Sequence, residues 1–410
     1  MRKPDMRNYV LVTGAYWADT IADGASRMLV LFYLYQRGYS PLKIASLFIF
    51  YEMFGVVTNL VGGWLAARLG LRTTLLSGLG VQLLALGMLA LIPGPDLTVV
   101  LVMITQALSG IAKDLTKMSS KSAVKLVVTD EKPGALYKWV AILTGSKNAL
   151  KGVGFFIGAL GLSVVGFRVS MLLLGVMILA ALTGVLTFMH GELGRPDAKA
   201  KFRQMFSNNH AVNILAAARI FLFASRDVWF VVALPVFFET VHHWSFWLAG
   251  GFLAVWTIGY GIVQAFAPRL FSRRAGNPDG RTATWLAFAL AAFPALIALA
   301  LAANLAPLVA VVVGLLFFGV AFALNSTVHS YLILAYSDGD KVAMNVGFYY
   351  MANAGGRLAG TVLSGALYQW QGLQTCLWAS AAFILAAGVL SRRLPAAKTR
   401  RPAGVAVAAG

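Results

Sequence analysis

Twelve long apolar stretches dominate the 410-residue sequence. They lie at residues 9–35, 43–67, 73–92, 97–124, 137–165, 168–189, 212–239, 246–270, 282–302, 306–335, 342–369 and 373–391. A helix needs about 20 mostly apolar residues to cross a membrane. A backbone in lipid must also satisfy its own hydrogen bonds, which favours helices. The sequence therefore predicts an all-α membrane protein with 12 transmembrane helices.

The composition argues against a soluble protein. Hydrophobic residues make up 59% of the chain and charged residues 12%, and the mean hydropathy is +0.76. Soluble domains are roughly 45–50% apolar and roughly 25% charged. The chain has one cysteine and five scattered histidines without an HExxH pattern. We therefore expect no disulfide, no metal site and no cofactor.

The basic residues indicate the orientation in the membrane. With the N-terminus inside, 22 of the 34 lysines and arginines fall in cytoplasmic segments and three fall in outer loops. Cytoplasmic loops of membrane proteins carry such an excess of positive charge. The pattern predicts a multi-pass protein of the bacterial inner membrane with both termini cytoplasmic. It also explains most of the net charge of +19 without a nucleic-acid partner.

The chain has signs of an internal duplication. Ala25-Ser-Arg27 returns as Ala224-Ser-Arg226, and Asn148-Ala returns as Asn353-Ala, at offsets of about 200 residues. This predicts two pseudo-symmetric six-helix bundles with a substrate site between them near the middle of the membrane. The expected units are a first bundle at 1–190, a cytoplasmic linker at 191–211, a second bundle at 212–394 and a disordered tail at 395–410.

Charged residues inside the apolar stretches are the main candidates for function. The basic ones are Arg27, Lys113, Lys117, Lys121, Lys147, Lys151, Arg219, Arg226 and Arg357. The acidic ones are Asp19, Asp23, Glu52, Asp114 and Asp227. A charge at the centre of a membrane helix costs roughly 2.5–3.5 kcal/mol, so most of these side chains should pair or face a watery cavity. Their surplus of positive charge predicts an anionic ligand.

The fourth apolar stretch carries lysines at every fourth position, which places them in one slanting stripe on a helix. We expect Lys113 and Lys117 to bind the substrate in a cavity. For Lys121, a cavity position and a solvated helix end are equally favoured. The fifth stretch repeats the pattern with Lys147 and Lys151, which are also expected to bind the substrate. The alternative for this pair is a structural ion pair with Asp114 or Asp19.

Arg27 and Arg226 occupy matching positions in the two halves. Two guanidinium groups facing each other would clamp a phosphate-like oxyanion through paired hydrogen bonds. The alternative is a local ion pair of each arginine with a nearby aspartate. Arg357 is a third candidate for substrate binding, whereas Arg219 is nearer the cytoplasmic end and is expected to act in a gate or an ion pair.

The remaining candidates are neutral or acidic. Asn148, Asn353 and Tyr16 are expected to contact the substrate. Asp19 and Asp23 share one helix face, and with Asp114 they are candidates for carrying a proton or for balancing basic charge.

The segment from Gly62 to Arg72, Gly-Gly-Trp-Leu-Ala-Ala-Arg-Leu-Gly-Leu-Arg, resembles the signature loop of the major facilitator superfamily. The resemblance implies a transporter that works by alternating access. It also implies a cytoplasmic gate at Gly63, Arg68, Gly70 and Arg72. The superfamily usually has an acid where this chain has Ala67, so part of the usual charge relay of the gate is missing.

The lysine-rich blocks at 108–126 and 143–156, with Gly14-Ala-Tyr-Trp17 and Asn59-Leu-Val-Gly-Gly63, resemble the ArsJ family of organoarsenical efflux permeases. That resemblance implies export of 1-arseno-3-phosphoglycerate and hence arsenate resistance. It also implies a functional partner, glyceraldehyde-3-phosphate dehydrogenase, which makes this ester from arsenate in place of phosphate. Both ends of the ester are tetrahedral oxyanions, which suit lysines and arginines. A single cysteine argues against trivalent arsenic, which prefers thiolates.

Other functions remain open from the sequence. The nearest alternative is an exchanger of organophosphates or inorganic phosphate. A membrane-embedded transferase and a protein that handles anionic lipids are less favoured, because there is no nucleophile with a matching base and because the charges lie deep in the helices. The energy source is also open among proton antiport, substrate exchange and uniport.

Overall fold

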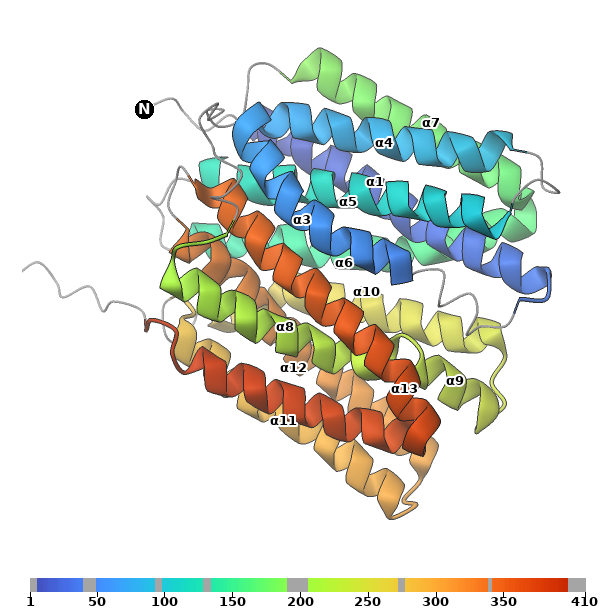
Figure 1. Ribbon diagram of the computed structural model, residues 1–410, viewed down its shortest axis with the longest axis vertical. Helices are drawn as coiled ribbons and strands as arrows, with labels where there is room; N and C mark the ends of the chain where they lie inside the picture. The colour runs from blue at the N-terminus through green and yellow to red at the C-terminus, as the bar shows by residue number, and fades with distance from the viewer. Residues whose placement is uncertain are drawn as a thin grey trace, which may run out of the picture.

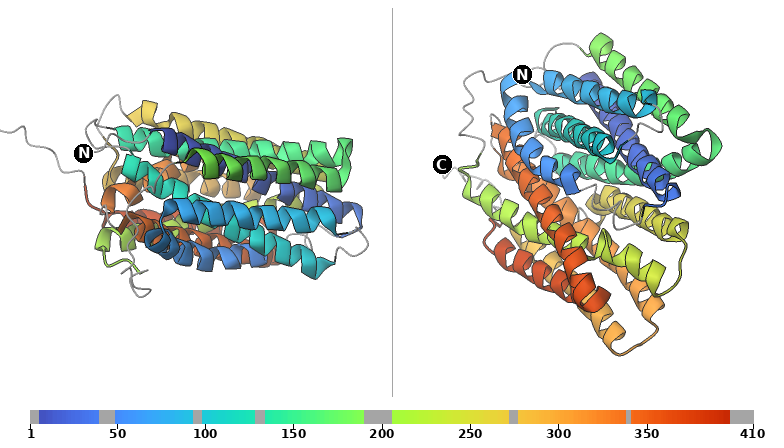
Figure 2. Two further views of the ribbon diagram at one scale, coloured as in Figure 1. Left: turned by 90° about the horizontal axis from the view of Figure 1, so that it is seen from above. Right: turned by 45° about the vertical axis from the view of Figure 1, so that its right-hand side comes forward.

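The computed structural model describes residues 6–39, 49–92, 98–127, 134–189, 206–271, 277–337 and 341–396. Within these ranges the chain forms helices and no strands, which confirms the all-α prediction. The helices are α1 (Met6–Gln36), α3 (Ile49–Leu69), α4 (Leu71–Leu91), α5 (Val99–Val127), α6 (Ala135–Val164), α7 (Gly166–Phe188), α8 (His210–Phe230), α9 (Ala233–Thr240), α10 (Phe246–Phe271), α11 (Gly280–Ala302), α12 (Pro307–Tyr336) and α13 (Val342–Ser391). They run along one another in a bundle (Figures 1 and 2).

Two of the longer helical segments are interrupted. α8 and α9 continue one another from His210 to Thr240, with a break at Val231 and Val232. In α13 the backbone is non-helical at Gln371 and Gly372, and the φ of Gly372 is +73°. A residue without a Cβ adopts such a φ at little cost. The chain reverses direction there, between the stretches expected at 342–369 and 373–391 (Figure 1).

Eight helical segments of the described chain are long and apolar enough to cross a membrane. The number is smaller than the twelve expected. α13 counts once despite its break, and α1, α3 and α6 are not among the eight. These three helices carry charged side chains such as Asp19, Glu52 and Lys147. The count of twelve therefore stays a prediction, whereas several membrane-crossing helices are present.

The helices gather in two halves. We call residues 6–189 the first half and residues 206–396 the second half. In Figure 1 the first half fills the upper part of the molecule and the second half the lower part. Contacts between them run along α3 with α13 and along α6 with α10. The expected two bundles and their boundaries stay predictions, and residues 190–205 of the linker and 397–410 of the tail lie outside the described residues.

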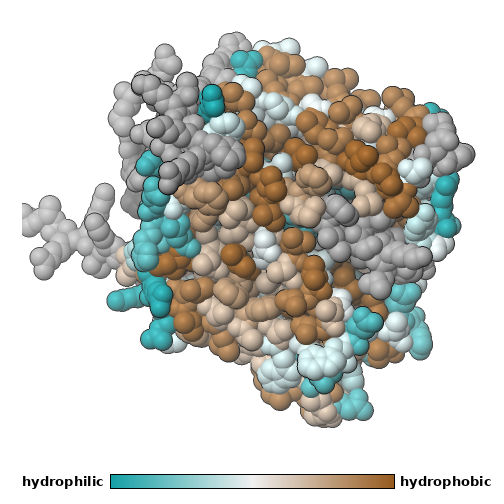
Figure 3. Space-filling view, in the orientation of Figure 1, coloured by the Kyte–Doolittle hydropathy of each residue, from teal (hydrophilic) through white to brown (hydrophobic). Residues whose placement is uncertain are grey.

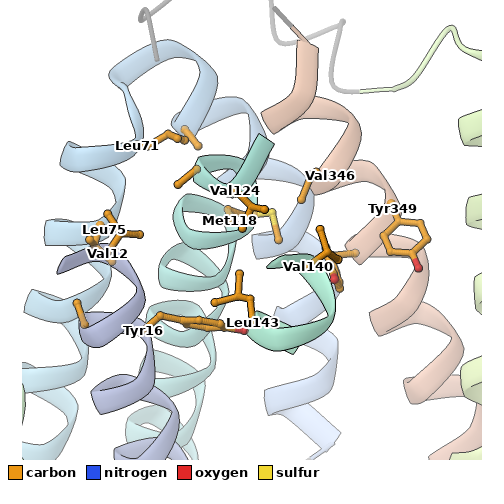
Figure 4. Close-up of a cluster of buried hydrophobic side chains, with 14 of the residues drawn as sticks. Val12, Tyr16, Leu71, Leu75, Met118, Val124, Val140, Leu143, Val346 and Tyr349 are labelled. Atoms are coloured by element: carbon orange, nitrogen blue, oxygen red, sulfur yellow. The ribbon is translucent and has the colours of Figure 1, made fainter. Parts of the chain in front are cut away.

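Two clusters of buried apolar side chains form the core. One includes Leu75 and Leu79 of α4, and the other includes Trp229 of α8 with Phe318 of α12. Figure 4 shows that the first cluster crosses the boundary between the halves, since it includes Val346 and other residues of α13. Apolar side chains also cover much of the face of the bundle seen in Figure 3, with hydrophilic residues mainly toward the helix ends. Such a surface suits a lipid environment.

Besides the stacking of Phe32 on Trp247 toward the other end, with centroids 3.9 Å apart, the halves touch at one end of the bundle, which we call the N-terminal face because α1 begins and α13 ends there, on the left in Figure 1. There α3 crosses α13 so closely that a Cβ on Gly63 would lie 2.7 Å from the Cα of Gly347. The rings of Tyr137 and Tyr331 also meet, with centroids 5.2 Å apart. The other end is called the opposite face.

Candidate anion-binding cavity

A cavity of about 340 Å³ lies between the two halves. All ten residues expected to bind the substrate line it. They are Tyr16, Arg27, Lys113, Lys117, Lys147, Asn148, Lys151, Arg226, Asn353 and Arg357. The lining extends from Lys121 and Arg219 to Leu31, Glu239 and Gly250, which lie near the opposite-face ends of α1, α9 and α10. The helix contacts at the N-terminal face lie beyond the other end of the cavity.

The cavity carries a surplus of positive charge. All nine basic residues that the sequence places inside the apolar stretches line it. Four carboxylates also line it, those of Glu52, Asp114, Asp227 and Glu239. Nine minus four leaves a formal charge of +5 on the lining. A concave surface with one dominant sign of charge attracts ions of the opposite sign.

The lysines come from α5 and α6 of the first half. Lys113, Lys117 and Lys121 lie one helical turn apart along α5, and each is less than 10% exposed. Lys117 lies 2.6 Å from Asp114, and Lys113 donates a hydrogen bond of 2.6 Å to the hydroxyl of Tyr51. These partners hold two of the lysines in place while their side chains still line the cavity.

Lys147 and Lys151, both on α6, have different surroundings. Lys151 lies 3.2 Å from Asp23, so its partner is neither of the two aspartates expected. Lys147 has no carboxylate within ion-pair distance in the described part of the chain, and its Nζ contacts the side-chain oxygen of Asn148 at 3.2 Å. The leading charges that act on Lys147 are those of other basic groups, namely Lys151, Lys113, Lys117 and Arg357. This lysine is therefore open to an anion.

Three arginines line the cavity within an ion-pair network. Arg357 binds Glu52 and also lies 3.2 Å from Asp227. Arg226 pairs at 2.5 Å with its sequence neighbour Asp227, which is the local ion pair that the sequence left open. Arg27 lies 3.9 Å from Glu52 and 4.1 Å above the ring of Tyr51, rather than beside Asp23. Arg27 and Arg226 both line the cavity, which is compatible with a clamp around an oxyanion. The clamp itself stays a prediction.

Lys121 and Arg219 are two cavity residues that the sequence did not assign to substrate binding. Lys121 is 4% exposed, donates to the hydroxyl of Thr144 and lies 5.6 Å from the ring centroid of Tyr350, so it is not a solvated helix end. Arg219 is 3% exposed and donates to Asn353 at 3.0 Å. The sequence did contain a signal for both. Lys121 continues the four-residue lysine repeat, and Arg219 precedes Arg226 by two helical turns.

The three candidate aspartates are buried, and Asp114 alone lines the cavity. Asp23 accepts a hydrogen bond of 2.8 Å from Tyr51 in addition to its ion pair with Lys151. Asp19 has no ion pair among the described residues. It accepts a hydrogen bond of 2.6 Å from Thr116, while its Oδ1 has no hydrogen-bond partner there. Asp23 and Asp114 thus pair directly with lysines, whereas Asp19 has no lysine within ion-pair distance in the described ranges.

The four gate candidates lie outside the cavity lining. Gly63 packs against Gly347, as described above. Gly70 has a φ of +89° directly before α4, and Arg68 lies 5.2 Å from the ring centroid of Trp64. Arg72 donates a 3.3 Å hydrogen bond to the carbonyl of Leu186 in α7. Among them, Gly63 alone lies at the closest α3–α13 crossing, so it is the one whose size directly affects the contact between the halves.

No metal-binding group of histidine, cysteine and carboxylate side chains occurs in the ranges that the structure describes. The single cysteine, Cys376, is buried in α13 away from the cavity lining. The chemistry available in the cavity is therefore that of lysine, arginine, carboxylate, amide and hydroxyl groups.

Comparisons with known proteins agree with this architecture. The family model of the Major Facilitator Superfamily matches residues 12–334. No curated protein sequence matches the chain. The human organic anion transporter MFSD10 (TETRAN) has a similar structure, with a TM-score of 0.74 and 15% identity over 95% of this chain and 100% of that one.

Two further solved structures are similar over nearly their whole length. A bacterial homologue of the iron transporter ferroportin in its outward-facing state has a TM-score of 0.74 and 14% identity, over 94% of this chain and 98% of that one. The proton:xylose symporter XylE bound to 6-bromo-6-deoxy-D-glucose has a TM-score of 0.73 and 15% identity, over 94% and 95%. Identities this low establish the fold alone.

Proposed function

The chain belongs to the major facilitator superfamily and is a secondary membrane transporter, and from that premise we propose that it exports the organoarsenical 1-arseno-3-phosphoglycerate and thereby confers arsenate resistance. The observation that carries the proposal is the cavity lining, in which nine basic side chains oppose four carboxylates. A substrate with an arsenate group at one end and a phosphate group at the other supplies the negative charge that this lining lacks. The resemblance of the lysine-rich blocks to the ArsJ family supports the choice of this particular anion.

The transport cycle follows from the same charges. In the empty cavity Lys147 is surrounded by other basic groups, so the lysines and arginines repel one another. A bound oxyanion removes this repulsion and accepts paired hydrogen bonds from the arginines. The two halves then close around the substrate, and the site becomes accessible from the other side of the membrane. Lys113, Lys117, Lys147, Lys151, Arg27, Arg226 and Arg357 bind the two oxyanion groups in this proposal, and Asn148, Asn353 and Tyr16 contact the substrate.

The proposed setting is the inner membrane of a bacterium. In this proposal twelve transmembrane helices in two bundles put both termini on one side of the membrane, and the excess of lysine and arginine there favours the cytoplasm, where glyceraldehyde-3-phosphate dehydrogenase makes the substrate. The N-terminal face is then the cytoplasmic face, and Gly63, Arg68, Gly70 and Arg72 belong to the cytoplasmic gate. The cavity lining reaches toward the periplasmic side.

A second candidate function is an exchanger of organophosphates or inorganic phosphate. It rests on the same surplus of lysine and arginine, because phosphate and arsenate groups have the same shape and similar charge. Competition for transport by 3-phosphoglycerate or phosphate favours this alternative.

Everted membrane vesicles test the proposal directly. Vesicles with and without the protein receive arsenate, glyceraldehyde 3-phosphate, NAD and the dehydrogenase, and the arsenic they accumulate is counted. Parallel samples omit the triose phosphate or the dehydrogenase. Accumulation in the complete mixture alone supports the organoarsenical as cargo. Accumulation from arsenate alone makes the protein a carrier of inorganic oxyanions, and no accumulation in active vesicles favours the phosphate exchanger.

A further inference from the structure

We propose that the cavity contains a second anion subsite at its N-terminal-face end, formed by Lys121 and Thr144 of the first half and by Arg219 and Tyr350 of the second. Its ligand is a phosphate-like group, which is one of the two anionic groups of the cargo. The subsite deepens the proposed function and rests on it for the identity of the cargo, but its binding chemistry requires only an oxyanion.

The distribution of ion pairs singles out the residues involved. Six of the nine basic side chains in the cavity lie within 4.0 Å of a carboxylate, namely Arg27, Lys113, Lys117, Lys151, Arg226 and Arg357. The other three, Lys121, Lys147 and Arg219, have no such partner in the described ranges. A buried charge without an opposite charge is costly, so a ligand that supplies it stabilises the protein.

These three side chains form two separate groups. Lys121 lies 5.6 Å from the ring centroid of Tyr350, Arg219 lies 5.2 Å from that of Tyr349, and these two ring centroids are 5.1 Å apart, whereas Lys147 contacts Asn148 of its own helix. The hydrogen bond from Lys121 of α5 to Thr144 of α6 places the Lys121 amino group beside α6 at the position of Thr144. Thr144 precedes Lys147 by three residues. Three residues correspond to about 4.5 Å along a helix axis. An anion with two charged ends a few bonds apart therefore reaches both groups.

Hydrogen bonds to neutral groups hold the side chain of Arg219 in the proposed subsite. Its Nε donates to Asn353 at 3.0 Å and its Nη1 to the hydroxyl of Ser326 at 3.1 Å, while the guanidinium lies 4.0 Å from the ring centroid of Phe223. These neutral neighbours hold the guanidinium without cancelling its charge. On the other side Lys121 is held by the Thr144 hydroxyl and lies near the ring of Tyr350.

The position of the subsite gives it a role in the transport cycle. Lys121 and Thr144 belong to α5 and α6, and Arg219 and Tyr350 belong to α8 and α13. An oxyanion between them bridges the two halves beside the face where the helices already touch. Binding there therefore stabilises the closed N-terminal face, while the group at Lys147 is nearer the middle of the cavity.

The test compares a two-ended and a one-ended anion on the full chain in lipid nanodiscs. Propane-1,3-diyl bisphosphate, which has one phosphate at each end and no other charged group, and methyl phosphate are the probes, and binding is measured by calorimetry. We expect the two-ended anion to bind the wild-type protein at least about tenfold more tightly than the one-ended anion, because its second group binds intramolecularly. The measured quantity is this ratio of the two affinities. Lys121→Gln and Arg219→Gln should each reduce this ratio to below about threefold. Lys138→Gln, at an exposed position on the N-terminal face, is the matched control and should keep the ratio.

Melting temperature without anion separates binding from folding. Lys121→Gln removes a buried cation that has no carboxylate partner, so it should melt no lower than the wild-type protein. A ratio that stays unchanged in both Lys121→Gln and Arg219→Gln overturns the subsite. If the ratio falls in both variants but the wild-type protein does not transport the organoarsenical, the subsite is supported and the proposed cargo is wrong. If the wild-type protein transports the organoarsenical but the ratio is unchanged in both variants, the cargo is supported and the subsite is wrong.

Discussion

Arg357 of α13 and Glu52 of α3 are 305 positions apart in the sequence and form an ion pair across the boundary between the two halves. Arg357 also contacts Asp227 of its own half, and Glu52 lies 3.9 Å from Arg27 of its own half. The network therefore joins arginines and carboxylates of both halves at the cavity wall. Any rearrangement that separates α3 from α13 at this level has to break it.

Glu52→Gln should lower the melting temperature of the protein without anion. Removing one partner of a buried ion pair costs about 3–5 kcal/mol, and the lower end is expected because the Arg357 side chain is 21% exposed. Phosphate should in turn raise the melting temperature of this variant more than that of the wild-type protein, because Arg357 has lost one of its two carboxylate partners and can bind the anion in its place. Glu239→Gln is the control, since Glu239 lines the same cavity without an ion pair in the described chain. Equal melting temperatures of both variants would contradict the proposed role of the network.

Lys147→Ala should reduce export in the vesicle assay to the level of empty vesicles. Lys147 is the cavity lysine around which basic groups gather without a carboxylate, so its charge is available for the oxyanion. Hydrogen bonds to charged groups contribute roughly 1.5–3 kcal/mol, which corresponds to a loss of affinity of about ten- to 150-fold. Lys138→Ala, on the same helix but exposed, should retain export. Export that survives the Lys147→Ala change would remove this residue from the binding site.

Gly63→Ala should shift the protein away from the arrangement in which the N-terminal face is closed. The new Cβ would lie 2.7 Å from the Cα of Gly347 and 2.8 Å from a backbone oxygen of α13, so the helices must separate. Overpacking of this kind costs about 1–3 kcal/mol. A cysteine introduced by Thr144→Cys at the cavity end nearest this face reports the shift as faster thiol labelling, since native Cys376 is buried.

Gly80→Ala is the control for this measurement, because a Cβ there meets no atom within 4 Å. Labelling that is equally slow in the Gly63→Ala and Gly80→Ala proteins would show that the crossing tolerates a methyl group and does not control closure.

Asp19→Asn should abolish accumulation driven by a pH gradient while leaving exchange of substrate across the membrane intact. Asp19 is fully buried, has a single neutral hydrogen-bond donor in Thr116 and has no ion pair in the described ranges, which suits a proton-carrying group. Asp23→Asn should instead impair both activities, because it leaves Lys151 without its carboxylate. Counterflow and gradient-driven uptake in reconstituted vesicles measure the two separately. Loss of both activities in Asp19→Asn would favour a structural role.

The helices and the basic lining were predictable from the sequence because each depends on local composition. Long apolar stretches favour helices in lipid, and buried lysines and arginines are too costly to face it. The cost argument led to the nine residues that line the cavity. It required no knowledge of which helix neighbours which.

The partners of these residues were not predictable in the same way. Arg226 and Asp227 are adjacent in the sequence, so their pairing was open to local reasoning. The Arg357–Glu52 pair depends on how the two halves meet, which no local pattern encodes. The burial of Lys121 likewise depends on Tyr350, a residue of the other half. The sequence therefore left Lys121 evenly open between a cavity position and a solvated helix end, because it gave no information on that neighbour.

Val346 and Tyr349 of α13 belong to the second half by sequence but pack in one apolar cluster with residues of the first half such as Met118 and Val140 (Figure 4). Separating the N-terminal face exposes part of this cluster to water. The closed arrangement is thus stabilised by hydrophobic burial, which weakens on cooling. Temperature therefore acts on the conformational equilibrium itself, and cooling shifts the protein toward separation of this face before any substrate is bound.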